Sequence, residues 1–76
     1  MAYPTYSLEV NTDQGWVLVK GTEASNRPHH YDTLRAEFDK LVKMALPYTA
    51  HFVQEFGYRI ACNGQDVDVW MAHPIN

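Results

Sequence analysis

The sequence predicts an α+β fold: a two-layer sandwich in which a four-stranded antiparallel sheet packs on one long and one short helix, in the order ββααββ. Three observations predict it. Apolar and polar residues alternate around a turn near the start of the chain and again near its end, and between them an apolar stripe recurs with the period of a helix. At 76 residues, we expect one small domain over residues 1–76.

A hairpin is predicted at the start of the chain. Apolar residues alternate over residues 6–10, TDQG then forms a turn with three or four loop residues, and the apolar run WVLV follows. Gly15 suits the left-handed position that closes such a turn. Two registers fit this pattern: one places Trp16 and Leu18 on the core face, and the other turns both outward and the two valines of the run inward. Either way, WVLV is apolar on both faces, which indicates a strand covered on both sides or a contact surface.

A long helix is predicted after the polar connector of residues 22–31. Asp32 or Thr33 suits its N-cap, because short polar side chains accept hydrogen bonds from the free N–H groups of a first turn. The apolar positions that recur at helical spacing are Leu34, Phe38, Leu41, Val42 and Ala45. Charged residues occupy the opposite face, which we expect to be solvated.

A second, shorter helix is predicted after Pro47. Proline lacks a backbone N–H and clashes with the preceding turn, so it ends the first helix and suits the start of another. The apolar face of this second helix would comprise Tyr48, Phe52, Val53 and Phe56. Gly57 would end it.

A second hairpin is predicted in YRIACNGQDVDVWM. Asn-Gly at residues 63–64 predicts a type I′ turn, which needs positive φ at both positions. Cys62 then pairs with Gln65. Continuous pairing from there brings Gly57 opposite Trp70. The face expected to join the core comprises Tyr58, Ile60, Cys62, Val67, Val69 and Met71. The solvent-facing side comprises Arg59, Ala61, Asp66, Asp68 and Trp70.

This register leaves a tryptophan on an acidic, water-facing side of the sheet, which has two explanations. One is that Trp70 covers the bare backbone of Gly57. The other is that Trp70 anchors a protein partner, since tryptophan and arginine are frequent at the centres of interfaces. Arg59, expected to form a cross-strand ion pair with Asp68, would lie in its polar rim. The residues expected on this partner-binding surface are Trp70, Arg59, Asp66 and Asp68, joined by Trp16 and Leu18 if the first hairpin turns them outward.

The histidines and the single cysteine do not predict a metal or catalytic site. The candidates are His29, His30, His51, His73 and Cys62. Adjacent histidines do not readily reach one ion, and no Cys-x-x-Cys or His-x-x-x-His pair occurs. Cys62 falls on the expected core face with no base placed beside it, so we expect a non-enzymatic protein without metal or cofactor. His29 and His30 are expected to be contacts that the connector makes with a partner, or a pH-sensitive patch.

Charge and composition argue against several classes of partner. Six Lys and Arg residues against nine Asp and Glu residues give a formal net charge of −3. Without a basic cluster, direct binding to nucleic acid or to an anionic membrane is not expected. One cysteine allows no internal disulfide, and the N-terminal residues lack the apolar segment of a signal peptide, which predicts a cytoplasmic protein.

In size and architecture, this short, acidic, cysteine-poor chain resembles small proteins of phages and mobile elements, some of which bind and block a host enzyme. The resemblance implies a non-enzymatic protein-binding module that acts as an inhibitor by occluding a host protein. Two alternatives stay open. One is a homodimer or structural subunit whose WVLV strand or open sheet face is covered by a second copy. The other is a small metal-binding protein or enzyme built on the histidines.

Overall fold

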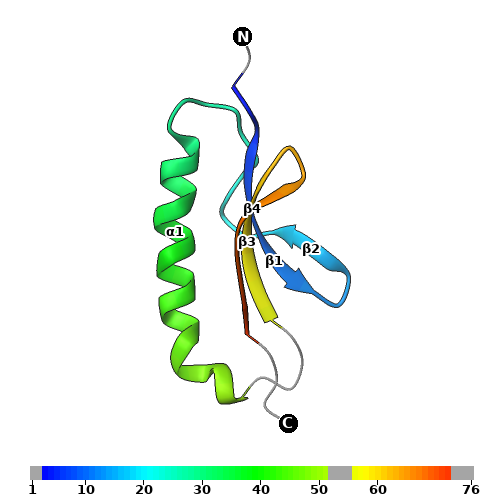
Figure 1. Cartoon of the computed structure of the whole chain (residues 1–76), viewed down its shortest axis with the longest axis vertical. Coiled ribbons are helices and arrows are strands. Elements are labelled where there is room, and N and C mark those ends of the chain that lie inside the picture. The colour runs from blue at the N-terminus through cyan, green and yellow to red at the C-terminus, as the bar shows by residue number, and fades with distance from the viewer. Residues whose placement is uncertain (1–2, 52–55, 73–76) are drawn as a thin grey trace.

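The computed structural model describes residues 3–51 and 56–72. Its elements are β1 (Tyr6–Thr12), β2 (Gly15–Leu18), α1 (His30–Ala45), the 3₁₀ helix η1 (Leu46–His51), β3 (Phe56–Cys62) and β4 (Gln65–Ala72). The strands form one antiparallel sheet in the order β2-β1-β3-β4, and α1 lies along one of its faces (Figure 1). The predicted α+β class with a four-stranded antiparallel sheet is confirmed.

The predicted ββααββ order is not confirmed, because the described residues contain a single α-helix. After α1 ends, Leu46–His51 form a 3₁₀ helix, and Phe56 begins β3 instead of continuing a helix. Pro47 cannot donate the hydrogen bond that would extend α1, which agrees with its predicted role as a helix stop. Phe52 and Val53 of the predicted stripe lie outside the described residues. No helix in the described ranges is long and apolar enough to span a membrane.

The core lies between α1 and the helix-facing side of the sheet. Leu8 of β1 and Ile60 of β3 are paired directly and are both 0% exposed. Leu34 and Phe38 of α1 pack against them, and Leu41 and Val42 add partly buried contacts. The predicted apolar stripe of the helix therefore faces the sheet.

The helix begins earlier than predicted. His29, rather than Asp32 or Thr33, is its N-cap, with a left-handed φ of 67° and no capping hydrogen bond from its side chain. The backbone N–H of Thr33 donates to the carbonyl oxygen of His29 at 3.2 Å, so Thr33 already lies within the first turn. The preceding chain is held in place because the ring of His30 bonds to the backbone of Glu23.

The first hairpin adopts the register that turns Trp16 and Leu18 away from the core. Leu18 pairs with Glu9 of β1, and directly opposed residues of antiparallel strands share a face. Val17 and Val19 consequently lie on the helix-facing side. Val19 packs against the core, whereas Val17 stays exposed because β2 lies apart from α1 (Figure 1).

The turn of this hairpin is shorter than predicted. Thr12 pairs with Gly15, which leaves two loop residues rather than three or four. Gly15 has a φ of 97°, the left-handed conformation expected of it. The hydroxyl of Thr12 donates to the carbonyl oxygen of Gly15 at 2.9 Å and accepts the N–H of Gln14 at 3.1 Å, which closes the tight loop.

The second hairpin follows the prediction at its turn and departs from it within three residues. Residues 63–64 have the predicted positive φ values, 51° and 86°, and the first two pairs beyond them form as expected. Ile60 then pairs with Asp68 rather than with Val67. Val67 is thus an extra residue, a β-bulge, and pairing beyond it is shifted by one position.

This bulge reverses the predicted faces of β4. Tyr58 pairs with Trp70, so the indole lies on the helix-facing side, and Arg59 pairs with Val69, so that valine lies on the other. The predicted core positions of Val67, Val69 and Met71 are therefore wrong, as is the predicted solvent-facing position of Trp70. Packing against α1 explains this reversal. An indole has more apolar surface to bury than a valine, and it fits into the space beside the helix.

Aromatic contacts hold the partly buried Trp70 against the core. Its ring is stacked on Tyr58, with centroids 6.4 Å apart and planes at 17°, and meets Phe56 edge-on at 6.5 Å. The predicted cover over Gly57 comes instead from Met71: a Cβ at Gly57 would lie 2.3 Å from its sulfur and 2.4 Å from the carbonyl oxygen of Trp70. Glycine is required at this position by close approach.

Replacing Trp70 by alanine is expected to lower the free energy of unfolding by about 3 kcal/mol, because its aromatic packing is lost. Val69→Ala, at the adjacent exposed position, is the matched control and should change the stability by less than about 0.5 kcal/mol. Urea denaturation followed by circular dichroism measures both. Small and equal effects would contradict the bulged register.

Candidate protein-binding face

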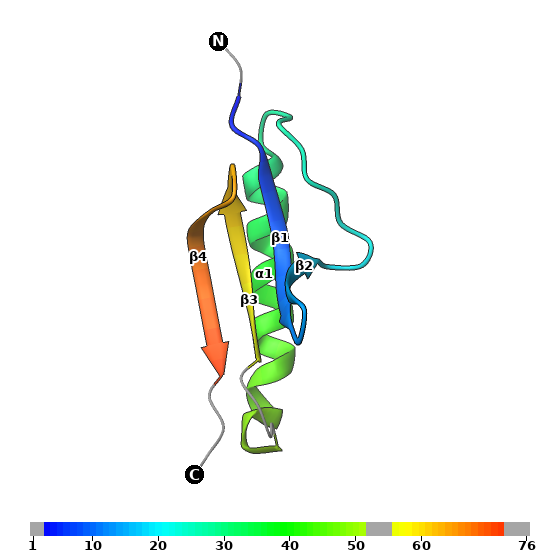
Figure 2. The same cartoon turned by 90° about the vertical axis from the view of Figure 1, so that its right-hand side faces the viewer.

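The sheet face opposite α1 is covered by no helix in the described part of the chain (Figure 2). We call it the open face; its side chains include Glu9, Trp16, Leu18, Arg59, Asp66, Val69 and Met71. One row crosses all four strands, because Leu18 pairs with Glu9, Glu9 with Arg59, and Arg59 with Val69. This central row therefore runs from an apolar side chain through an acid and a base to a second apolar side chain.

Arg59 organises the centre of the open face. Its Nε and Nη2 each lie 2.6 Å from Glu9 Oε1, and its Nη1 lies 2.6 Å from Asp66 Oδ1. The guanidinium also lies over the ring of Trp16, 4.7 Å from the centroid. Burial opposes the charge, but the hydrogen bonds to the two carboxylates outweigh it and hold the pKa of Arg59 above its ordinary value. Four side chains from four strands are thus held in one arrangement.

The exposed apolar side chains of this face lie at the two ends of the central row. Leu18 is 47% and Val69 46% exposed. The side chains of Arg59 and Glu9 between them are only 16% and 18% exposed. Apolar surface is therefore open to solvent at the two edges of a well-covered ionic centre.

Four of the residues predicted to bind a partner meet on the open face: Trp16, Leu18, Arg59 and Asp66. Trp70 and Asp68 do not, because the bulge at Val67 turns them toward α1. The predicted ion pair between Arg59 and Asp68 is wrong for the same reason. The arginine binds Glu9 and Asp66 instead.

Asp68 anchors the helix to the sheet. Its carboxylate accepts a hydrogen bond from the Tyr31 hydroxyl and lies 3.0 Å from Arg35 Nη1. Tyr31 in turn packs its ring on Tyr6, with centroids 5.2 Å apart. The hydrogen bond to Asp68, with burial and the nearby negative charge, raises the pKa of Tyr31. A carboxylate on the core side of a strand is thereby compensated by two partners from α1.

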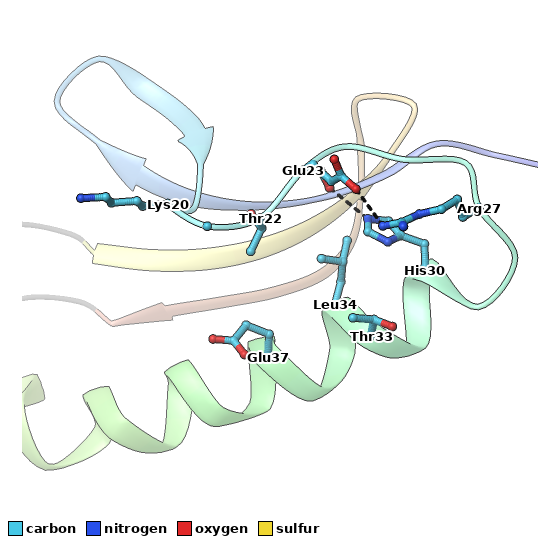
Figure 3. Close-up of a pocket in the computed structure, with 9 residues that line it drawn as sticks. Lys20, Thr22, Glu23, Arg27, His30, Thr33, Leu34 and Glu37 are labelled. Atoms are coloured by element: carbon cyan, nitrogen blue, oxygen red, sulfur yellow. Dashed lines mark hydrogen bonds and ion pairs between the residues drawn. The ribbon is translucent and has the colours of Figure 1, made fainter.

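The histidines of the connector hold it to α1. His30 is buried, and its Nε2 donates to the carbonyl oxygen of Glu23 at 2.9 Å, while Arg27 forms an ion pair of 2.7 Å with the Glu23 carboxylate (Figure 3). His29 is exposed, with Nδ1 3.6 Å from Asp32 Oδ2. A groove of about 590 Å³ separates the connector from α1. Its charged lining has both signs: Lys20, Glu23, Arg27 and Glu37. Neither histidine lies on the open face.

Two residues of the central row were not predicted to bind a partner. Glu9 carries a usable signal, since a single acid between Leu8 and Val10 must point away from the core they form. Val69 carries none, because its face depends on the bulge. Both are needed to complete the central row.

In residues 3–51 and 56–72, no three or more His, Cys, Asp or Glu side chains are grouped so as to hold a metal ion. Asp66 and Asp68 lie on opposite faces of the sheet. Cys62 is half-buried and pairs with Tyr6 on the helix-facing side, which confirms the predicted face of this residue. His73 and the side chain of His51 lie outside the described part.

No protein-family model matches the chain, and searches of the curated proteins and of the solved structures also return no match.

The contact between Tyr31 and Asp68 predicts a pH dependence. Because folding raises the pKa of Tyr31 above its ordinary value of 10.0, the neutral hydroxyl stabilises the fold fully below that value, and this contribution is lost as pH rises through the folded pKa. The stability difference between wild type and Tyr31→Phe should therefore shrink as urea denaturation is repeated from neutral to alkaline pH. Tyr58, whose pKa is raised by burial, is present in both proteins and cancels. A difference independent of pH would contradict the contact.

Proposed function

We propose that this chain is a small, non-enzymatic protein-binding module that contacts another protein through its open face. The observation that carries the proposal is the central row, in which Leu18 and Val69 stay about half exposed at either end of a rigid ionic centre. Apolar surface kept in water is costly, at roughly 25 cal/mol per Å². A partner that covers both ends of the row would recover this energy.

The composition of the open face supports the same proposal. Tryptophan and arginine dominate the energetic centres of protein interfaces, and here Trp16 and Arg59 are stacked on each other. Both are fixed before binding, because two carboxylates hold the guanidinium. Little side-chain freedom is lost on binding a surface that is already ordered.

The charged residues of the open face indicate which chemical groups a partner would present to it. The ionic centre holds two carboxylates, Glu9 and Asp66, against the one guanidinium of Arg59, and the chain as a whole carries a net charge of −3. Asp66 is the most exposed of the three, so it can accept a basic group at the rim. A surface with apolar side chains beside a lysine or arginine would fit.

Inhibition by occlusion is the activity we propose for such a module. A rigid face of four strands can cover a functional site on a larger protein without doing chemistry of its own. The single cysteine is consistent with action in a reducing compartment such as the cytoplasm.

Leu18→Glu is expected to weaken partner binding by about 2 kcal/mol or more, because it places a carboxylate where apolar contact is proposed. Val17→Glu is the matched control: it makes the same change at the adjacent exposed residue, on the helix-facing side of the same strand. Affinity capture from lysate with wild type and both variants, followed by titration calorimetry with the captured protein, measures the effect. Equal binding by Leu18→Glu and wild type would contradict the proposal.

A further inference from the structure

The central row of the open face is complementary to itself. Across the strands it reads Leu18, Glu9, Arg59 and Val69, that is, apolar, acidic, basic, apolar. A half-turn about an axis that runs along the strands, between β1 and β3, reverses this order. The reversed row places an acid over each base and an apolar side chain over each apolar side chain.

We infer that the open face binds a second copy of this chain about that two-fold axis. The inference rests on the proposed function, because it places the second copy on the same open face; another protein that binds there must displace that copy. Leu18 of one copy then lies over Val69 of the other, and Glu9 lies over Arg59. Such an arrangement is an isologous interface, in which each contact occurs twice.

The neighbouring row supports the same axis. Trp16 pairs with Asn11, two residues beyond Glu9 in β1, and Met71 pairs with Gly57, two residues before Arg59 in β3. Because β1 and β3 are antiparallel, these pairs lie at the same level of the sheet. The half-turn therefore brings Trp16 of one copy over Met71 of the other, a favourable contact between an aromatic ring and a thioether.

The exposed fractions of the side chains indicate which groups stabilise this dimer. Arg59 and Glu9 are already largely covered and paired within one chain, so little further desolvation opposes the approach of a second copy. Leu18 and Val69 have about half of their surface left to bury. The apolar ends therefore drive the association, and the charges set its register.

The other two-fold axis in the plane of the sheet, perpendicular to the strands, is unfavourable. It would place Glu9 over Glu9 and Arg59 over Arg59, since each strand would face its own copy. Like charges brought together in a covered interface cost several kcal/mol. The charge pattern thus selects one of the two face-to-face arrangements.

Sedimentation equilibrium from about 1 µM to about 1 mM tests the association. Wild type and Val17→Glu should approach the mass of two chains as concentration rises. Leu18→Glu should self-associate about 100-fold or more weakly, because its carboxylate would be buried unpaired against Val69 of the second copy. Val69→Lys should behave likewise.

Mixing the two variants should restore the dimer, since the introduced carboxylate and the introduced amine then face each other. All of these positions are exposed, so the variants should fold; circular dichroism checks this.

Cross-linking tests the axis. In a Cys62→Ser background, a bis-maleimide that spans about 10 Å, the separation of packed sheets, should join Leu18→Cys chains to Val69→Cys chains. It should not join Leu18→Cys chains to one another. The perpendicular axis predicts the reverse, because it places Leu18 over Leu18.

Wild type that keeps the mass of one chain over the whole range would overturn the inference, as would cross-links between Leu18→Cys chains. These failures are distinguishable from failure of the proposed function. If the chain is monomeric but Leu18→Glu still loses a captured partner that Val17→Glu retains, the open face binds another protein and only the dimer is wrong. If Leu18→Glu changes neither the self-association nor the capture of a partner, both the dimer and the proposed function are wrong.

Discussion

Val67 has no partner in β3, and every residue of β4 beyond it faces the side of the sheet opposite to the one that unbroken pairing would give it. The contacts of β4 with the core and with α1 depend on this single insertion. It brings Trp70 against Tyr58 in the core and Asp68 within reach of Tyr31 on α1. A bulge interrupts the hydrogen-bond ladder, and an inward carboxylate must be compensated. Burial of the indole and the contacts of Asp68 with α1 offset both costs.

The same insertion connects the two faces of the sheet. Because successive side chains of a strand point to opposite faces, the shift that turns Trp70 toward the core also exposes Val69 beside Arg59. The apolar–acidic–basic–apolar row of the open face is therefore a by-product of how the core is packed. The register of β4 thus sets both its packing against α1 and the residues it contributes to the open face.

The parts of the fold that local chemistry determines were predictable from the sequence. Positive φ at residues 63–64, the apolar stripe of α1 and the class of the sheet all follow from spacing and turn preferences. The faces of β4 were not predictable, because side chains of DVDVWM alternate between the two faces in either register. One register buries the valines, and the other buries an indole and a carboxylate. Residues of α1 distant in sequence decide between them, since Tyr31 and Arg35 make Asp68 acceptable on the core side.

The candidate site was predictable to the same extent as the fold. Arg59 and Asp66 lie on the turn side of the bulge, where the predicted register holds, and one of the two open registers of the first hairpin placed Trp16 and Leu18 correctly. Val69 lies beyond the bulge and was assigned to the wrong face. The predicted register holds on the turn side of the bulge and is wrong beyond it.

The bulge has a further consequence for the edges of the sheet, which are β2 and β4. An edge strand offers unpaired backbone groups to any passing chain, and proteins resist such strand addition with short edges, bulges and inward-pointing charges. Here β2 has only 4 residues, and β4 carries both the bulge at Val67 and the inward Asp68. Neither edge is a good template for a further strand. The sheet is therefore protected against growing sideways into fibrils, even at concentrations high enough for its open face to be occupied.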